Sequence, residues 1–528
     1  MRIKNITFKE YTQAQPMILP PNLEELIPEG HLVRVVNKII DGIEMDSFLE
    51  NYKGGGTSSY HPKMMLKLIV YAYVDKIYTS RRIAKALREN VNYMWLGGNN
   101  RPGFRTIARF RGEALKGKIR TVFTYVLTVL IEMGYVKMED YLVDGTKIEA
   151  DANAHKVVWA KRVKKSKAGL LEQIQGLLNE IEEANRAEDE EYGDNDLEEL
   201  GSSEEINTER LQEIIAKINE QLKGQSEKKE VKKMVKELEK KYIPRLEKYE
   251  EQEQILAGRS SYSKTDPDAS SMLMKEDRAS AKPWPRPAYN VQIGAEGQFI
   301  VGFSIHQTAG DSGCFIPHME QQSWPRGKKP RNVCGDGAYG SEENFAYLER
   351  NGQGNYLKYN AFYQDTHPTH KPEKQQAAQF RSENFPYNAE TDTLTCPAGK
   401  VLMYQETIPY RSLNGYLTKR RVYECKDCAD CALKEKCNKS QGNRRIQMSL
   451  DLREHRQRAR ENLLSEHGRL LRKQRATELE GIFGNIKHNL GFRRFHLRGN
   501  EKVEIEWGLI CLAHNLRKLG KMMRKGNG

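Results

Sequence analysis

A long charged segment separates the first apolar strand of this sequence from the strands that follow. The stretch Tyr141–Ala150, YLVDGTKIEA, has the apolar character of a strand, and alternating apolar residues return only at 289–293 and 298–306. Between them, leucine, isoleucine and valine recur at helical spacing from Leu170 to Leu238. The sequence therefore predicts an α/β core whose strands are interrupted by a helical, coiled-coil-like insertion.

The segment before this core reads as an all-α domain. In HPKMMLKLIVYAYVDKIY and RPGFRTIARFR the apolar residues lie on one helical face, and the Gly-rich sequence GGNN breaks the chain before the second of them. This order is compatible with a helix-turn-helix that touches DNA, and equally with a plain helical bundle. The candidate DNA-binding residues here are Arg101, Arg105 and Arg109.

The chain of 528 residues is too long for one ordinary core. We expect a helical N-terminal domain, 1–135; the first core strand, 136–154; the charged helical insertion, 155–280; the continued core, 281–385; a Cys-rich insertion, 386–445; and basic C-terminal helices, 446–528.

The charge of the chain is unevenly distributed. The 85 Lys and Arg exceed the 72 Asp and Glu by 13, although residues 180–205 hold thirteen acidic residues and one arginine, a local charge of −12. Residues 441–528 carry 20 − 9 = +11. A basic balance makes a polyanion the first partner to test. The acidic block is typical of a solvated linker, with a partner-binding or DNA-mimicking role as the alternative.

Neither secretion nor membrane insertion is indicated. The N-terminal sequence MRIKNITFKEYTQ has no apolar signal-peptide region, and no apolar run approaches the roughly 20 residues that span a bilayer. We expect a cytoplasmic protein that does not enter a membrane.

Three carboxylates are candidates for a metal site. Asp144 and Asp336 each follow an apolar strand and precede a glycine, and Glu480 lies on a later helix, on the same face as Lys487 seven residues on. Hard Mg²⁺, or Mn²⁺, prefers carboxylate oxygen, and two such ions roughly 3.5 to 4 Å apart suit an in-line phosphoryl displacement. The alternatives are ordinary Asp-Gly turns and an exposed helical glutamate. Glu478, the local rival, points to the opposite side of the helix.

Five of the eight cysteines are gathered in one short region. Cys396 is followed by Cys425-x2-Cys428-x2-Cys431-x5-Cys437. Thiolates at this spacing predict a structural Zn²⁺ site in a reducing compartment, with four of the five as ligands. An iron–sulfur cluster and unliganded cysteines are the alternatives.

Four motifs in a fixed order carry a family resemblance. The sequences YLVDGTKIEADAN, RPAYNVQI, NVCGDGAYGSEEN and LEGIFGNIKHNLGFRRFHLRG follow the helical domain. Together they resemble the DDE transposases of bacterial insertion sequences, and most of all the insertion-sequence eleven-eighty-two family. The resemblance implies a ribonuclease H-like catalytic core with the metal-binding triad Asp144, Asp336 and Glu480. Arg475 is the nearest candidate for the signature arginine of the wider group, and Lys487 for its lysine.

The same resemblance implies what the protein does. It implies metal-dependent cleavage at the ends of a mobile element and attack of the freed 3′-hydroxyl on target DNA. The partners are then double-stranded DNA, as inverted-repeat ends and target, and a second copy of the chain in a dimer or larger oligomer on the bacterial nucleoid. The alternatives are a non-catalytic regulatory protein derived from a transposase, and a nuclease that cuts without joining. The residues expected to hold phosphates are Arg475, Lys487, Arg493, Arg494 and Arg498.

Overall fold

The computed structural model describes residues 22–50, 59–192, 206–222, 229–275, 277, 283–367 and 378–526. These residues fall into two compact units, one of residues 1–126 with 508–528 and one of residues 127–507. No helix in the described ranges is long and apolar enough to cross a membrane. Residues 193–205 of the predicted acidic block lie outside the described residues.

The first unit is helical, as predicted for this part of the chain. Its elements are η1 Leu23–Leu26, α1 Leu32–Asp41, α2 Asp46–Leu49, α3 Pro62–Val74, α4 Ser80–Glu89, α5 Val91–Leu96, α6 Phe104–Arg109, the π-helical η2 Phe110–Ala114 and the first part of α7 Ile119–Glu132. Helix α3 is buried on every side from Leu68 to Val74, which is typical of a helix enclosed by its neighbours. The helix begins at Pro62. His61 is its N-cap, because the His61 Nδ1 accepts a hydrogen bond from the Lys63 N–H at 3.2 Å.

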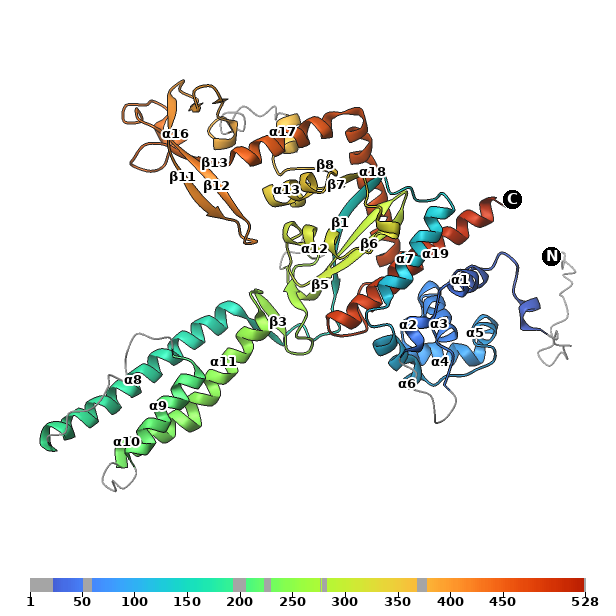
Figure 1. Ribbon diagram of the computed structural model, residues 1–528, viewed down its shortest axis with the longest axis horizontal. Helices are drawn as coiled ribbons and strands as arrows, with labels where there is room; N and C mark the ends of the chain where they lie inside the picture. Colours follow the sequence, from blue (N-terminus) through green and yellow to red (C-terminus); the bar gives the residue numbers. More distant parts are fainter. Residues whose placement is uncertain are drawn as a thin grey trace, which may run out of the picture. The chain divides into compact units, whose positions relative to one another are not determined.

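The second unit is organised around a mixed β-sheet. Strand β1, Asp140–Glu149, lies at its centre, antiparallel to β5, Arg286–Glu296, and parallel to β7, Asn332–Gly335. Strand β6, Phe299–His306, pairs with β5, and β8, Gly354–Leu357, pairs with β7. The resulting order is β6-β5-β1-β7-β8, with the short β4, Ser270–Met272, also on β5 (Figure 1).

The four predicted core strands, β1, β5, β6 and β7, occur where the sequence predicts them, with one difference, whereas β4 and β8 were not predicted. The predicted hairpin turns at Gly297 and Gln298, which both have positive φ. The strand that carries Asp144 does not end there, however, but continues to Glu149. It continues because β5 keeps pairing with it, from Gln292 opposite Gly145 to Ala288 opposite Glu149.

Helices connect and cover the sheet. Helix α12, Phe315–Glu320, contacts β6, and α13, Glu342–Arg350, contacts β8. Helix α17, Leu450–Leu464, packs on β8, and α18, Glu466–Gly484, packs on β1 and β7. The shorter elements are η5 Ser312–Cys314, η6 Pro325–Gly327, η7 Gly337–Tyr339, α14 Phe362–Thr366 and η8 Ser382–Asn384. Helix α19, Asn500–Gly526, begins in this unit and ends in the first.

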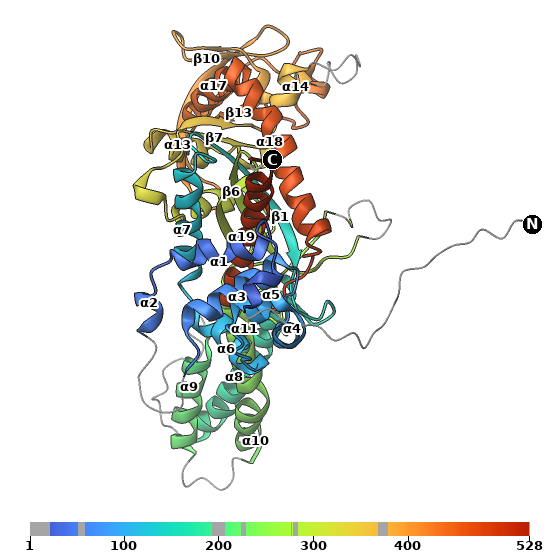
Figure 2. The same cartoon turned by 90° about the vertical axis from the view of Figure 1, so that its right-hand side faces the viewer.

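The charged insertion is a bundle with its own core. It consists of α8 Ala160–Tyr192, α9 Thr208–Gln221, α10 Lys229–Glu237, the π-helical η3 Leu238–Tyr242 and α11 Ile243–Leu256, which run side by side in Figures 1 and 2. The predicted periodic residues Leu170, Ile174, Leu211, Ile215 and Val235 are all buried in it. A short antiparallel pair, β2 Val157–Trp159 with β3 Ser261–Ser263, closes its base.

The Cys-rich segment forms a second, separate sheet. Its order is β13-β12-β11-β10-β9, and its elements are β9 Tyr387–Asn388, β10 Thr393–Thr395, β11 Val401–Arg411, β12 Leu417–Cys425, α16 Lys434–Cys437 and β13 Arg445–Met448. Leu394, Leu402 and Ile446 pack with Cys425 and Cys428 in its core.

Two glycines make room for a tyrosine of β1. Gly294 and Gly302 face each other on β5 and β6, and a Cβ atom on either would overlap Tyr141. The Tyr141 hydroxyl lies 2.7 Å from Nε2 of the buried His318. The sheet therefore admits this tyrosine only while both positions lack a side chain.

We expect the Gly294→Ala variant to lose about 1–3 kcal/mol of unfolding free energy, because overpacking forces the ring of Tyr141 from its place. Gly176→Ala is the matched control: Gly176 lies in α8 with no atom near its Cβ position, so alanine should be neutral or stabilising. Thermal unfolding of both variants beside the wild type measures the difference. Equal stability of the two variants would contradict this packing.

Candidate active site

Two aspartates from neighbouring parallel strands stand side by side. Leu142 of β1 pairs with Cys334 of β7, so Asp144 and Asp336 are level with each other, two residues further along. Each carboxylate has one oxygen fixed by the backbone: Asp144 Oδ1 accepts from Gly145 N at 2.8 Å, and Asp336 Oδ1 accepts from Ala338 N at 3.0 Å. The second oxygen of each points at a common partner.

That partner is Arg475, from the inner face of α18. Its Nη2 lies 3.2 Å from Asp144 Oδ2 and 3.4 Å from Asp336 Oδ2, and its Nε donates to the Val143 carbonyl at 3.4 Å. The arginine side chain is only 11% exposed, against 16% for Asp144 and 40% for Asp336. A single buried cation therefore joins the two carboxylates. Arg475 was predicted to hold a phosphate; here its guanidinium is bound to both acids.

The environment of Asp144 acts on its pKa in both directions. Burial raises the pKa of this carboxyl, and the nearby charge of Asp336 raises it further. The cations Arg475 and Lys275 oppose this shift, and Lys275 Nζ also donates to the Gly145 carbonyl at 3.3 Å. Asp144 is thus a carboxylate whose ionised form depends on a cation beside it.

A buried polar network lies next to the pair. Gln292, opposite Gly145 in the sheet, is fully buried; its Nε2 donates to Asn290 Oδ1 and Asp311 Oδ1, each at 3.0 Å. Its Oε1 accepts from the Tyr339 hydroxyl. These residues were not predicted from the sequence, although Asn290 and Gln292 alternate with apolar residues in a buried strand, a pattern that could have indicated them.

Glu480 lies on the same helix as Arg475 but is exposed to solvent. Glu478 points elsewhere: its Oε2 accepts from Gln298 N at 2.8 Å, at the β5–β6 turn. At about 100° per residue, Glu480 is about 160° from Glu478 around the helix and about 80° from Arg472. Glu480 is about 140° from Arg475 around the helix, so it is turned away from the two aspartates that Arg475 binds.

No three His, Cys, Asp or Glu side chains in the described part of the chain stand at the spacing of a metal site. Helix α18 ends at Gly484 and continues as the π-helical turn η9, Asn485–Asn489. The expectation that Glu480 and Lys487 share one face assumed a regular helix. The wider π turn changes the angle between them.

The five clustered cysteines lie near one another in the structure. Together they line one small cavity, of about 20 Å³, in the Cys-rich domain. Backbone N–H groups point at two of the sulfurs: Lys400 N lies 3.3 Å from Cys396 Sγ, and Arg444 N lies 3.4 Å from Cys428 Sγ. Cys425 differs because it belongs to β12, where it pairs with Leu402, and burial raises the pKa of its thiol to about 11.

Two transposase families match the chain. The Transposase DDE domain matches residues 395–520, which include Glu480 and the five cysteines, and the Transposase domain (DUF772) matches residues 21–113 in the helical unit. These matches support a DDE transposase of an insertion sequence. Asp144 and Asp336 lie between the two matched ranges. No curated protein and no solved structure matches the chain.

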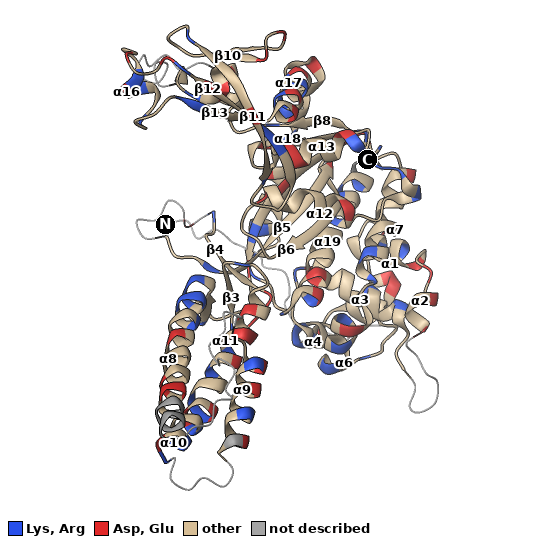
Figure 3. Ribbon diagram, turned by 60° about the vertical axis from the view of Figure 1, so that its left-hand side comes forward, with Lys and Arg blue, Asp and Glu red and all other residues tan. Residues whose placement is uncertain are grey.

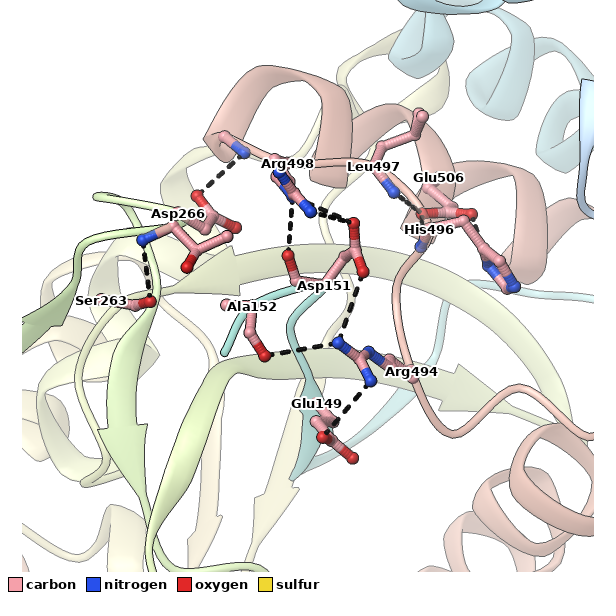
Figure 4. Close-up of polar contacts among 12 residues, drawn as sticks. Glu149, Asp151, Ala152, Ser263, Asp266, Arg494, His496, Leu497, Arg498 and Glu506 are labelled. Carbon is pink, nitrogen blue, oxygen red and sulfur yellow. Dashed lines mark hydrogen bonds and ion pairs between the residues drawn. The ribbon is translucent and has the colours of Figure 1, made fainter. Parts of the chain in front are cut away.

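The C-terminal arginines of the transposase have different surroundings. Arg494 lies 3.3 Å from Asp151 and 3.9 Å from Glu149, and Arg498 Nε donates to Asp151 at 2.9 Å (Figure 4). These contacts hold the segment after α18 against the end of β1. Arg493 is exposed and bonded to the Lys487 carbonyl at 3.2 Å. Of the predicted phosphate-holding residues, Arg494 and Arg498 thus already bind carboxylates of the protein.

The transposase's helical unit presents its predicted arginines to solvent. Arg101, Arg105 and Arg109 are all exposed, and Figure 3 shows Lys and Arg on α4 and α6. The guanidiniums of Arg81 and Arg105 lie 5.3 and 6.0 Å from the ring centre of the partly exposed Phe104. This surface has the charge that a DNA backbone requires.

We expect Arg475→Gln to destabilise the metal-free transposase by up to about 3 kcal/mol at pH 7, since it leaves two adjacent carboxylates without their cation. Because the pKa of Asp144 is raised, the stability due to its protonated form is present at low pH and lost as pH rises through that pKa. Removing Arg475 raises the pKa further, so the loss should be smaller at pH 4 than at pH 7.

Urea unfolding with a chelator present, at both pH values, measures this loss. The double variant Arg475→Gln/Asp144→Asn is the control and should recover stability at pH 7, because the second change removes the carboxylate charge that Arg475 no longer neutralises. An equal loss at both pH values, with no recovery in the double variant, would show that the ion pairs do not act in this way.

Proposed function

We propose that this transposase cuts DNA at the ends of its element and joins them to target DNA in a metal-dependent reaction. The observation that carries the proposal is the convergence of Asp144 and Asp336, from adjacent parallel strands, on one buried cation. Double-stranded DNA is the partner, and the chain acts as a dimer or larger oligomer on the nucleoid in the cytoplasm. Its placement in the insertion-sequence eleven-eighty-two family stays a prediction.

The proposed catalytic core is ribonuclease H-like. The strand order supports this: the first core strand is central, with the antiparallel pair β5 and β6 on one side and the parallel strands β7 and β8 on the other. In such a sheet the ends of β1 and β7 bring residues far apart in sequence to one edge. The helical bundle and the Cys-rich sheet are then insertions into this core.

The acid pair fits a divalent cation in donor type and charge. Two carboxylate oxygens face one point that already carries positive charge, and Mg²⁺ or Mn²⁺ prefers such hard oxygen donors. We propose that Asp144, Asp336 and Glu480 hold two such ions. The Oδ2 atoms of Asp144 and Asp336, which now contact Arg475, would then bind metal instead. The ions would supply activation of the attacking oxygen and stabilisation of the leaving oxygen.

The chain's own residues have the remaining tasks. Gly145 and Ala338 orient the carboxylates through their N–H groups, and Tyr339 with Gln292 keeps water from the buried side of the pair. The partly exposed Lys487, in η9, and the exposed Arg493, just after it, follow α18, and we assign them to hold a phosphate. Water first attacks a phosphodiester and releases a 3′-hydroxyl, which then attacks a second phosphodiester. No covalent protein intermediate is required.

We also propose a structural Zn²⁺ in the Cys-rich domain. The donor type fits, because five cysteine sulfurs line one cavity and zinc prefers such ligands, and backbone N–H groups point at Cys396 and Cys428. Binding would have to draw the sulfurs together, since no three of them stand at metal-site spacing in the described chain. Cys425 is the spare cysteine in this proposal, because it lies in strand β12, where it pairs with Leu402, and is the most deeply buried of the five. An all-cysteine site has no open position, so its role is structural.

We expect Asp144→Asn, Asp336→Asn and Glu480→Gln each to lower Mg²⁺-dependent strand cleavage and joining by more than about 100-fold, since even groups behind metal ligands contribute about 10- to 100-fold. Glu478→Gln is the matched control and should keep its activity, because Glu478 binds the β5–β6 turn. A gel assay on DNA taken from the sequences flanking the gene resolves both products.

The alternatives have different outcomes in this assay. Cleavage without joined product would identify a nuclease, and DNA binding without cleavage by the wild type would identify a regulatory protein. Full activity in Glu480→Gln with loss in Glu478→Gln would move the third acid to Glu478.

We expect one zinc ion per chain, with loss of zinc in the serine variants of Cys396, Cys428, Cys431 and Cys437 and retention in Cys425→Ala. Metal content of the purified proteins by mass spectrometry, with a melting curve for each variant, measures this. Zinc loss in Cys425→Ala with retention in Cys396→Ser would exchange the two roles. Iron in place of zinc would support a cluster.

A further inference from the structure

The hairpin of β11 and β12 extends well beyond the sheet of the Cys-rich domain. Its neighbours pair only near its base: β10 reaches Met403 on one side, and β13 reaches Arg421 on the other. From Glu406 to the tip, and back to Arg420, the two strands pair only with each other. This part is a two-stranded ribbon in which no residue is fully buried. We call residues 406–420 the ribbon.

The ribbon is positively charged. Residues 407–420 contain Arg411, Lys419 and Arg420 and no carboxylate, a net charge of +3. The single acid, Glu406, lies at the base, 3.6 Å from Arg445 of β13. Arg420 lies over the ring of Tyr410, with its guanidinium carbon 3.2 Å from the ring centre. The cations therefore stand on an ordered frame rather than on a loose loop.

The tip is a tight turn with an apolar end. Ser412 N donates to the Tyr416 carbonyl at 2.8 Å, and Gly415 turns the chain with φ of 88°. Between them Leu413 projects into solvent, with a relative exposure of 105%. Leu417, just past the turn, is 66% exposed. Single exposed leucines are common on proteins, but this one stands at the end of a paired, cationic ribbon.

One side of the tip is anchored to the catalytic core. Asn414 Nδ2 donates to Ser312 Oγ at 3.2 Å, and the Thr418 hydroxyl donates to Glu342. Ser312 follows Asp311, which belongs to the buried network of Gln292, and Glu342 begins the helix that follows the Asp336 turn. The ribbon thus contacts η5 and α13, which adjoin the buried network and the Asp336 turn, while Leu413 stays exposed.

We propose that the ribbon enters a groove of double-stranded DNA and that Leu413 acts as a wedge between base steps, bending the DNA beside the acid pair. A two-stranded ribbon fits a DNA groove, and apolar wedges kink the duplex where they unstack bases. Arg411, Lys419 and Arg420 bind the flanking phosphates. The absence of carboxylates from residues 407–420 favours a polyanion over a second copy of the chain. The inference rests on the proposed DNA substrate, but not on the chemistry at the acids.

The wedge is tested with Leu413→Ser in the full chain. The DNA is a linear duplex from the sequences flanking the gene, with 2-aminopurine at successive steps and dyes at its ends, and a chelator prevents cleavage. The wild type should increase 2-aminopurine fluorescence at one step and bring the dyes together. Leu413→Ser should lose both signals and bind at least about threefold more weakly. Val401→Ser, at the base of the same strand and 48% exposed, is the matched control and should behave as the wild type.

The cations are tested with the triple variant Arg411→Gln/Lys419→Gln/Arg420→Gln. The slope of log affinity against log salt should fall by roughly 2 to 3, because each released phosphate contact contributes about 0.9. Lys233→Gln/Lys236→Gln/Lys240→Gln removes the same charge from the helical insertion and should leave the slope nearly unchanged.

These readouts separate the inference from the proposed function. Ribbon variants that bend DNA and bind it with the wild-type salt slope would overturn the inference, even if the acid variants abolish cleavage. If the ribbon variants no longer bend DNA while Asp144→Asn keeps full activity, the inference about the ribbon would be supported and the catalytic proposal would be overturned. If Leu413→Ser changes the sedimentation of the protein but leaves DNA bending unchanged, the tip would bind a second copy of the chain rather than DNA. This result would also overturn the inference.

Discussion

The arrangement of the second unit depends on the pairing of strand β1 with two different partners. On one edge it is antiparallel to β5 over eight positions, and on the other it is parallel to β7 over three. The long pairing with β5 holds β1 extended past Asp144, and the short pairing with β7 sets Asp336 level with it. A shift of either register by one residue would turn one aspartate to the other face of the sheet. The two acids meet only because both registers are kept.

Bringing two carboxylates together in a partly buried place is unfavourable unless a cation accompanies them. Arg475 supplies this charge from α18, and its own burial among Asp144, Asp336 and the Val143 carbonyl fixes that helix against β1. The C-terminal segment is held by the same kind of contact, because Arg494 and Arg498 bind Glu149 and Asp151 at the other end of β1. Arginines that a basic tail offers for DNA are therefore partly used to hold the tail on the core.

Both insertions can be large because each has its own core. The helical bundle packs its leucines and isoleucines internally, and the Cys-rich sheet encloses Leu394, Leu402 and Ile446 with its cysteines. Neither needs apolar surface from the central sheet, so the connections between strands can be long without disturbing the registers. The ribbon β11–β12 returns from one insertion to the core through polar contacts at Asn414 and Thr418.

Periodicity by itself located the main elements of the core and of the helical insertion. Apolar alternation located β1, β5, β6 and β7, helical spacing located the bundle around Leu170 and Leu211, and cysteine spacing located the cluster around one cavity. These signals are local, because a strand or helix face repeats within a few residues. The motif order also pointed to Asp144 and Asp336 as partners.

Only the tertiary structure decided how the charged residues are used. Arg475 and Glu480 lie on one helix, yet the first binds both aspartates and the second faces solvent, because α18 packs on β1 and β7 through one side. The π turn at 485–489 alters the angle between Glu480 and Lys487, and the network of Gln292, Asn290 and Asp311 joins three distant segments. Charge and hydrogen bonding act between atoms that sequence separates, so their partners are set by the packing of the sheet and its helices.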